Sequence, residues 1–152
     1  MDEQVSRFTT WENHKRIEDT MTFLNMVTQK YENNQPSDWG IVYKETNMLI
    51  GTCGWVYLNE THRRAEIGYA LARKHWNRGI ITEAVKQVLH LGFHELNLNR
   101  IEARCIAENI GSERVMEKVG MQYEGLLREQ MFVKGRYVNV KLYSILKNEW
   151  NH

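Results

Sequence analysis

The sequence has only two cysteines, one proline and almost no net charge among its 152 residues. Cys53 and Cys105 form no CxxC pair, so a zinc or redox motif is not supported and two reduced core cysteines are the favoured interpretation. The 20 basic and 19 acidic residues leave a net charge of +1, so no overall field recruits nucleic acid or an anionic membrane. No apolar run approaches the roughly 20 residues of a membrane span, and the N-terminus is too polar for a signal peptide. We therefore expect a cytosolic protein without nucleic-acid or membrane partners.

The composition that remains is that of an ordinary globular domain. Hydrophobic residues make up 42% of the chain and charged residues 26%, which predicts one domain over residues 1–152. Hydrophobic periodicity and turn residues predict these elements: a helix over 14–33, strands over 39–44, 48–58 and 64–72, a helix over 80–96, a strand over 100–107, a short helix from Asn109 to Gly120, and a hairpin over 121–133 and 137–146. No secure element is predicted over 1–12. The strand, helix and strand over 64–107 imply two parallel strands, so the fold class is α+β.

The turn between the strand at 64–72 and the helix at 80–96 is the most informative stretch. It carries four basic residues within six positions, namely Arg73, Lys74, His75 and Arg78. Gly79 then opens the helix, and glycine allows a left-handed backbone or a close approach by a ligand. The first N–H groups of a helix have no internal partner and lie at the positive end of the helix dipole. This turn is therefore a candidate phosphate site.

Two familiar phosphate motifs are missing from this turn. A Walker loop requires GxxxxGK[ST], and a dinucleotide fingerprint requires GxGxxG, whereas this turn has a single glycine. A lone glycine before a helix is weak evidence, because many such glycines form simple tight turns.

A histidine pair on the following helix raises the question of a metal site. His90 and His94 are spaced i, i+4, as in helical zinc motifs, but Leu91 replaces the expected glutamate and no third ligand is evident. A solvated polar stripe is the favoured interpretation, and no metal is predicted.

The surroundings of the turn make the phosphate interpretation stronger. Residues 66–71 (Glu-Ile-Gly-Tyr-Ala-Leu) and 76–84 (Trp-Asn-Arg-Gly-Ile-Ile-Thr-Glu-Ala) resemble the acetyl-CoA-binding core of the GNAT superfamily of N-acetyltransferases. A second block agrees in the right order: 109–112 (Asn-Ile-Gly-Ser), 115–121 (Val-Met-Glu-Lys-Val-Gly-Met) and 124–125 (Glu-Gly). It is similar to the RimJ/RimL branch, whose members acetylate protein N-termini or small amines. The resemblance extends over residues 5–150.

The resemblance implies a fold and a donor site. The family has a mostly antiparallel, twisted sheet flanked by helices, and acetyl-CoA enters where two central parallel strands splay apart. In this chain the family's first strand and helix, which precede the helix at 14–33, are expected to be absent. Backbone N–H groups of 78–82 would hold the pyrophosphate, and the backbone of 70–72 would pair with pantetheine. The residues expected to bind acetyl-CoA are Ala70, Leu71, Ala72, Arg73, Arg78, Gly79, Ile80, Ile81, Thr82, Asn109 and Ser112.

Two residues are candidates for the chemistry. The amine must be neutral to attack the thioester, so a base takes its proton, and Glu66 matches a frequent acidic position of the family. The alternative for Glu66 is an ion pair with arginines of the strand at 100–107. Many relatives have a tyrosine at the position of Met116 that protonates the departing thiolate. Ser112 is the candidate replacement, and its alternative role is a helix-start hydroxyl that satisfies backbone groups.

These features together predict an acetyl-CoA-dependent N-acetyltransferase. The acetyl group would pass directly to a primary amine, either a peptide α-amino group or a small amine, without a metal or a covalent acyl-enzyme. A homodimer is possible by analogy with the family. The alternative from another functional class is a non-catalytic acyl-CoA-binding sensor, which the missing tyrosine keeps open.

Overall fold

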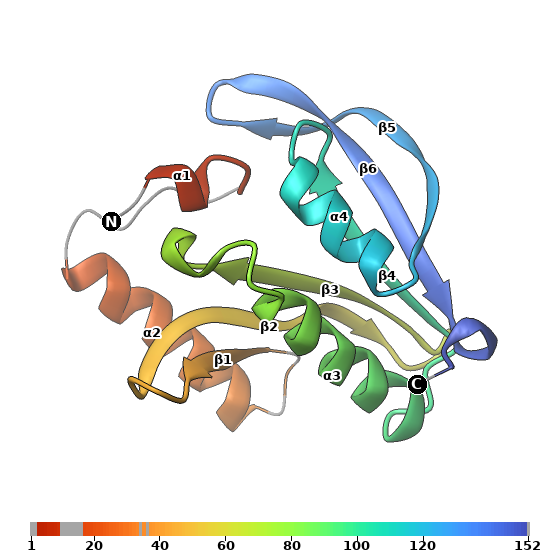
Figure 1. Ribbon diagram of the computed structural model, residues 1–152, viewed down its shortest axis with the longest axis horizontal. Helices are drawn as coiled ribbons and strands as arrows, with labels where there is room; N and C mark the ends of the chain where they lie inside the picture. The colour runs from red at the N-terminus through yellow and green to blue at the C-terminus, as the bar shows by residue number, and fades with distance from the viewer. Residues whose placement is uncertain (1–2, 10–16, 34, 36, 152) are drawn as a thin grey trace.

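The computed structural model describes residues 3–9, 17–33, 35 and 37–151, and Figure 1 shows its helices and strands. In chain order they are α1 (Glu3–Ser6), α2 (Ile17–Glu32), β1 (Asp38–Tyr43), β2 (Met48–Asn59), β3 (Arg64–Leu71), the 3₁₀ turn η1 (Arg73–His75), α3 (Ile80–His94), β4 (Arg100–Ile106), α4 (Ile110–Lys118), β5 (Gln122–Val133), β6 (Arg136–Leu146) and the 3₁₀ turn η2 (Lys147–Glu149).

The predicted helices and strands are confirmed to within a few residues, apart from residues 14–16 of the first helix, which lie outside the described part of the chain. Three short elements, α1, η1 and η2, were not predicted, because one turn is too short to show a helical period. The single-turn helix α1 precedes α2, and within the described residues no strand precedes α2. The sequence predicts that no helix precedes α2, and this is corrected by the structure, in which the four-residue helix α1 is present.

The six strands form one sheet in the order β1-β2-β3-β4-β6-β5, which is antiparallel except for the β3–β4 pair. The parallel pairing runs only from Arg64↔Arg100 to Ile67↔Ala103. Beyond this point β4 continues to pair with β6, as far as Ile106↔Val140, while β3 continues with β2, as far as Leu71↔Gly51. Figure 1 shows β3 and β4 diverging toward η1. The predicted mixed α+β sheet with two splayed parallel strands is confirmed.

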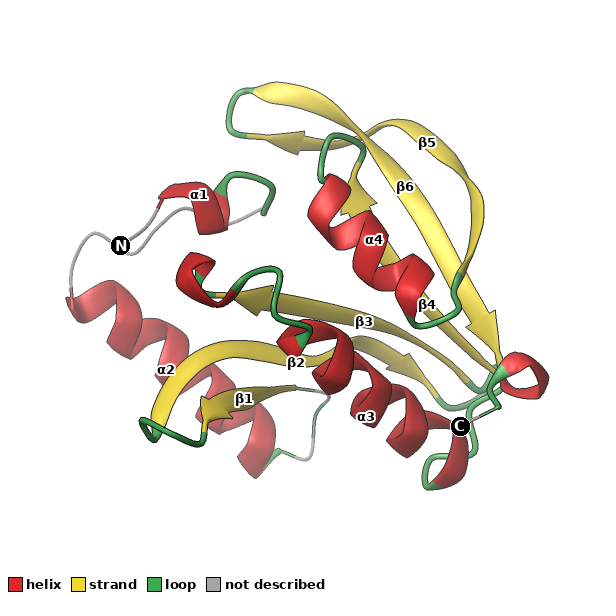
Figure 2. Ribbon diagram, viewed as in Figure 1, coloured by secondary structure: helices red, strands yellow, loops and turns green. Residues whose placement is uncertain are grey.

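The main core lies between the sheet and helices α3 and α4, which cover one of its faces (Figure 2). From α3, Val85, Leu89 and Phe93 are fully buried, and Met116 of α4 is 1% exposed. These side chains pack against Ile67 of β3 and its neighbours on the sheet. Helix α2 differs, since none of its residues is buried. The packing of α3 and α4 on one face fixes the N-termini of both helices beside the gap between β3 and β4.

The two cysteines are free and buried in this core, as the sequence predicts. Burial raises the pKa of the Cys53 thiol to about 12 and that of Cys105 to about 11. A thiol that stays protonated is a poor nucleophile. Both side chains therefore serve packing.

No helix in the described part of the chain combines the length and the apolar character that a membrane crossing requires.

Candidate active site

A cavity with a volume of about 420 Å³ opens where β3 and β4 separate. Its walls come from the end of β3, the turn into α3, the first turns of α4 and the segment after α1. Of the residues predicted to bind acetyl-CoA, the cavity is lined by Ala70, Leu71, Arg78, Gly79, Ile80, Ile81, Thr82, Asn109 and Ser112. Ala72 and Arg73 do not line it. Ala72 turns its N–H away to Ile50 O of β2, at 2.8 Å, and Arg73 begins η1.

The N-terminus of α3 is open to this cavity. Gly79 is the N-cap residue, with φ of 77° in the left-handed region, and no side chain caps the helix. A Cβ atom at Gly79 would meet nothing within 4 Å, so the turn borders open space. The first N–H groups of α3 therefore remain available to an anion, at the positive end of a 15-residue helix.

The N-terminus of α4 faces the same cavity but is capped by its own chain. The Asn109 side-chain oxygen accepts a hydrogen bond from Ser112 N at 3.1 Å, which confirms the predicted N-cap. This bond uses the oxygen of the Asn109 amide and leaves its nitrogen as a donor. The two helix starts thus play different parts: α3 offers backbone donors, and α4 offers side chains.

Three cations surround the cavity. Arg78 donates to the hydroxyl of Tyr43 at 2.7 Å and approaches His75 Nδ1 at 3.2 Å. Burial and the neighbouring charges of Lys74 and Arg78 lower the pKa of His75, so this ring is neutral near pH 7. Neither partner is a carboxylate, so neither neutralises the positive charge that Arg78 brings to the cavity.

The other two cations, Arg114 and Lys118, were not identified from the sequence. Both line the cavity from α4, and within the described part of the chain no carboxylate pairs with them, whereas Lys141 pairs with Glu113 at 2.7 Å. Ile110, Arg114 and Lys118 follow one another at intervals of four residues, which places them on one face of α4. This spacing was the signal in the sequence that could have identified the two cations.

The end of β3 offers backbone groups to the gap. The Ala72 N–H donates to β2, and N–H groups alternate between the two edges of a strand, so the Leu71 N–H faces the gap where β4 has moved away. The Leu71 carbonyl accepts a hydrogen bond from Trp76 Nε1 at 2.8 Å. A ligand that runs along this edge would meet an unpaired backbone donor.

Ser112 contacts a tyrosine that the sequence did not bring to attention. The Tyr69 hydroxyl lies 2.9 Å from Ser112 Oγ and 3.1 Å from Ser112 O. Both residues line the cavity. Met116, by contrast, is 1% exposed and belongs to the core, whereas Ser112 and Tyr69 both line the cavity from neighbouring positions.

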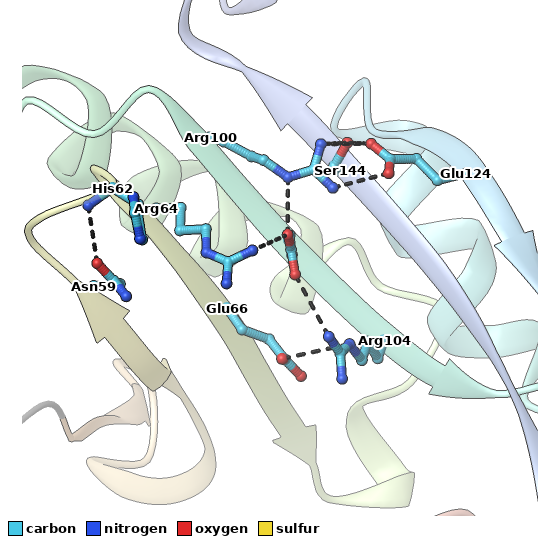
Figure 3. Close-up of polar contacts among 9 residues, drawn as sticks. Asn59, His62, Arg64, Glu66, Arg100, Arg104, Glu124 and Ser144 are labelled. Atoms are coloured by element: carbon cyan, nitrogen blue, oxygen red, sulfur yellow. Dashed lines mark hydrogen bonds and ion pairs between the residues drawn. The ribbon is translucent and has the colours of Figure 1, made fainter. Parts of the chain in front are cut away.

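Glu66 lies in a ladder of charged side chains on β3 and β4 (Figure 3). Arg104 Nε is 3.5 Å from Glu66 Oε2, and Arg104 Nη2 is 3.6 Å from Glu102 Oε2. Glu102, which is 4% exposed, also accepts from Arg100 Nε at 2.8 Å. The ion-pair alternative for Glu66 therefore exists in the structure.

The ladder lies on the sheet face opposite the helices. Glu66 is flanked in sequence by Ala65 and Ile67, which both belong to the core under α3 and α4, and side chains alternate along a strand. Glu66 consequently does not line the cavity. Burial raises the pKa of its carboxyl, Arg104 lowers it, and Glu102 raises it. The raised pKa favours proton uptake by Glu66 at a higher pH than usual.

The outer end of the ladder gives a test of its electrostatics. Hydrogen bonds from Arg100 and Ser144 lower the pKa of Glu124 to about 2. The stabilisation from this carboxylate is therefore present above its ordinary pKa of 4.5 and lost as the pH falls toward 2.

Glu124→Gln should be less stable than the wild type at neutral pH, and the difference in the free energy of unfolding should shrink below pH 4.5. Urea unfolding at several pH values measures it, with Glu60→Gln in the exposed β2–β3 turn as the control; a difference independent of pH would contradict the ion pair.

A second groove, of about 560 Å³, lies between β1 and α3 and is lined mainly by apolar side chains. Of the predicted site residues it contains only Ile80, which also lines the first cavity. His90 and His94 are exposed on α3 with ring centroids 4.3 Å apart. No group of three or more potential metal ligands occurs among the residues that the structure describes. The cavity at the gap is therefore the candidate active site.

Comparisons with known proteins agree with this geometry. The family model described as acetyltransferase (GNAT) domain matches residues 1–122. The uncharacterized N-acetyltransferase p20 of Bacillus licheniformis is 36% identical over 149 residues, which cover 98% of this chain and 84% of that protein. The spermidine N(1)-acetyltransferase of Vibrio cholerae is 32% identical over 102 residues, or 67% of this chain and 59% of that protein. The crystal structure of a GNAT-family acetyltransferase from Bacillus anthracis has a TM-score of 0.84 at 30% identity, covering 97% of this chain and 84% of that one. The chain belongs to the GNAT family of acetyltransferases.

Proposed function

We propose that this protein transfers the acetyl group of acetyl-CoA directly to a primary amine while both substrates are bound. The observation that carries the proposal is the cavity at the β3–β4 gap, where an uncapped helix N-terminus and an unpaired strand edge meet. The helix N-terminus suits the phosphates of the donor, and the strand edge suits its extended pantetheine arm.

The phosphates would contact the N-terminus of α3. The backbone of 78–82 supplies N–H donors, and Gly79 lets the pyrophosphate approach the turn closely. Arg78, Arg114 and Lys118 surround the same space with positive charge that no described carboxylate neutralises. A ligand with several phosphate groups matches this arrangement better than a neutral one.

The thioester would lie at the end of β3. Pantetheine would run along the edge of β3 that faces the gap, beside Ala70 and Leu71, with the Asn109 amide nitrogen as a further donor. The Ala72 backbone is not free for this pairing, because its N–H is bonded to Ile50 O. The Leu71 N–H would then donate to the thioester carbonyl oxygen and stabilise the negative charge that develops there as the amine attacks.

The amine would approach from the opposite face of the sheet, where Glu66 lies. As the nitrogen bonds to the carbonyl carbon it gives up a proton, and Glu66 would accept this proton directly or through one water. The carbon–sulfur bond then breaks, and its electron pair stays on sulfur. Ser112, at the cavity wall, would donate a hydrogen bond to this sulfur.

The acceptor is proposed as a class rather than a compound: a primary amine, either a protein N-terminal α-amino group or a small amine. The block at 109–121 supports the RimJ/RimL branch. The spermidine acetyltransferase of Vibrio cholerae acts on a polyamine, which supports testing small amines. A cytoplasmic location is a further proposal, made from the sequence pattern. A homodimer is proposed from the family resemblance, and sedimentation at several concentrations tests it.

Binding of the donor should stabilise the fold. A ligand at a hundredfold excess over its Kd adds about 2.7 kcal/mol to the free energy of unfolding. Acetyl-CoA should therefore raise the melting temperature, whereas ATP and NAD at equal concentration should not. Absence of any shift with saturating acetyl-CoA would remove the proposed donor.

A further inference from the structure

Tyr69 reaches from β3 to the start of α4 across the gap between β3 and β4. Its hydroxyl lies 2.9 Å from Ser112 Oγ, although the two residues are 43 positions apart in the sequence. The contact lies within the wall of the cavity, so it is positioned beside any ligand that occupies the gap.

The hydroxyl of Tyr69 has one proton and two possible acceptors. It can donate to Ser112 O, at 3.1 Å, or to Ser112 Oγ, at 2.9 Å. Donation to the carbonyl would leave the Tyr69 oxygen to accept the proton of Ser112, which would then point away from the cavity. Donation to Ser112 Oγ leaves the Ser112 proton free to point into the cavity.

The second arrangement is favoured for two reasons. Ser112 lies inside α4, which continues to Lys118, so its carbonyl is already an acceptor in the helix. The contact to Ser112 Oγ is also the shorter of the two. Burial raises the pKa of Tyr69, which keeps the phenol protonated and able to donate.

We propose that Tyr69 is a positioning residue whose phenol donates to Ser112 Oγ and thereby directs the Ser112 proton toward the sulfur of acetyl-CoA. Tyr69 keeps its own proton throughout and does not touch the thioester. This inference rests on the proposed function, because it acts through the contact between Ser112 and the departing sulfur.

A double-mutant cycle tests the coupling. Tyr69→Phe keeps the ring and removes one neutral hydrogen bond, so kcat should fall roughly two- to twelvefold. The Kd for acetyl-CoA, measured by calorimetry, should stay unchanged, as for an interaction used only when the bond breaks. In the Ser112→Ala background, Tyr69→Phe should cause no further loss.

Tyr143→Phe is the matched control. Tyr143 is a buried strand residue whose hydroxyl donates to Glu113 at 2.7 Å, and Glu113 lies on α4 next to Ser112. Tyr143 does not line the cavity. It should lower the melting temperature about as much as Tyr69→Phe without lowering kcat. Losses that multiply in the Tyr69/Ser112 double variant, or an unchanged kcat in Tyr69→Phe, would overturn the role of Tyr69. A wild type that releases no thiol would instead overturn the proposed transfer itself.

Discussion

Glu66→Gln is expected to lower kcat/KM by roughly 10²- to 10⁴-fold, the usual contribution of a general base. The wild type should show a rising acid limb in kcat/KM, because Glu66 accepts a proton only when ionised. Burial raises the pKa of this carboxyl, so the limb should lie above the ordinary value of 4.5. The glutamine variant should be slow at every pH and lack the limb. An unaltered rate and profile would leave Glu66 with the ion pair alone.

Deprotonation of the amine substrate can also produce an acid limb. A variant of Arg104 distinguishes a limb caused by the substrate from a limb caused by Glu66. Arg104 lowers the pKa of Glu66 through its positive charge. Arg104→Gln should therefore move a Glu66 limb to higher pH and leave an amine limb in place. Arg64→Gln is the control, because Arg64 contacts Glu102, at 3.7 Å, and is not among the groups that shift Glu66. A limb that does not move in Arg104→Gln would assign it to the substrate.

Gly79→Pro is expected to weaken acetyl-CoA binding by roughly 10- to 150-fold, the value of one hydrogen bond to a charged group. Proline has no N–H, and its φ near −65° is incompatible with the observed 77°. Gly79 is exposed and a side chain there would meet no atom within 4 Å, so the fold should survive. Titration calorimetry measures the change in Kd.

Two further variants separate lost binding from backbone strain. Gly135 has φ of 81° in the β5–β6 turn and an equally open surrounding, but it does not line the cavity. Gly135→Pro should cost comparable stability without changing the Kd for acetyl-CoA. Gly79→Ala keeps the N–H and adds only the strain of a left-handed alanine, about 1–2 kcal/mol, so its Kd should lie closer to the wild type. An unchanged Kd in folded Gly79→Pro would place the phosphates elsewhere.

The elements around the site were predictable because their signals are local. Alternation placed Arg64 and Glu66 on one face of their strand, and Arg100, Glu102 and Arg104 on one face of the next, so the ladder could be expected before the structure. Asn109 was recognisable as an N-cap because the preference of asparagine there is local too. The splay of β3 and β4 came from the family resemblance, since no residue pattern specifies where a parallel pair separates.

Long-range contacts were not predictable in the same way. The pairing of Tyr69 with Ser112 depends on how α4 packs across β3, and the sequence gives no distance between them. Phe8, which lies just after α1, lines the cavity wall, and no pattern in the sequence predicts this. Arg73 looked like a phosphate ligand because of its basic neighbours, but it begins η1 and does not line the cavity, whereas His75 at the end of the same turn does. Each of these features is decided by tertiary packing.

The most direct test of the account is thiol release from acetyl-CoA by the full chain with a panel of primary amines. The panel should contain peptides with free α-amino groups, a polyamine and amino-acid-derived amines, and mass spectrometry should identify the acetylated product. We expect at least one amine to yield one thiol per acetylated amine, at a rate that falls in Glu66→Gln. A protein that acetyl-CoA stabilises against melting, but that releases no thiol with any amine, would contradict acetyl transfer and indicate a protein that only binds the donor.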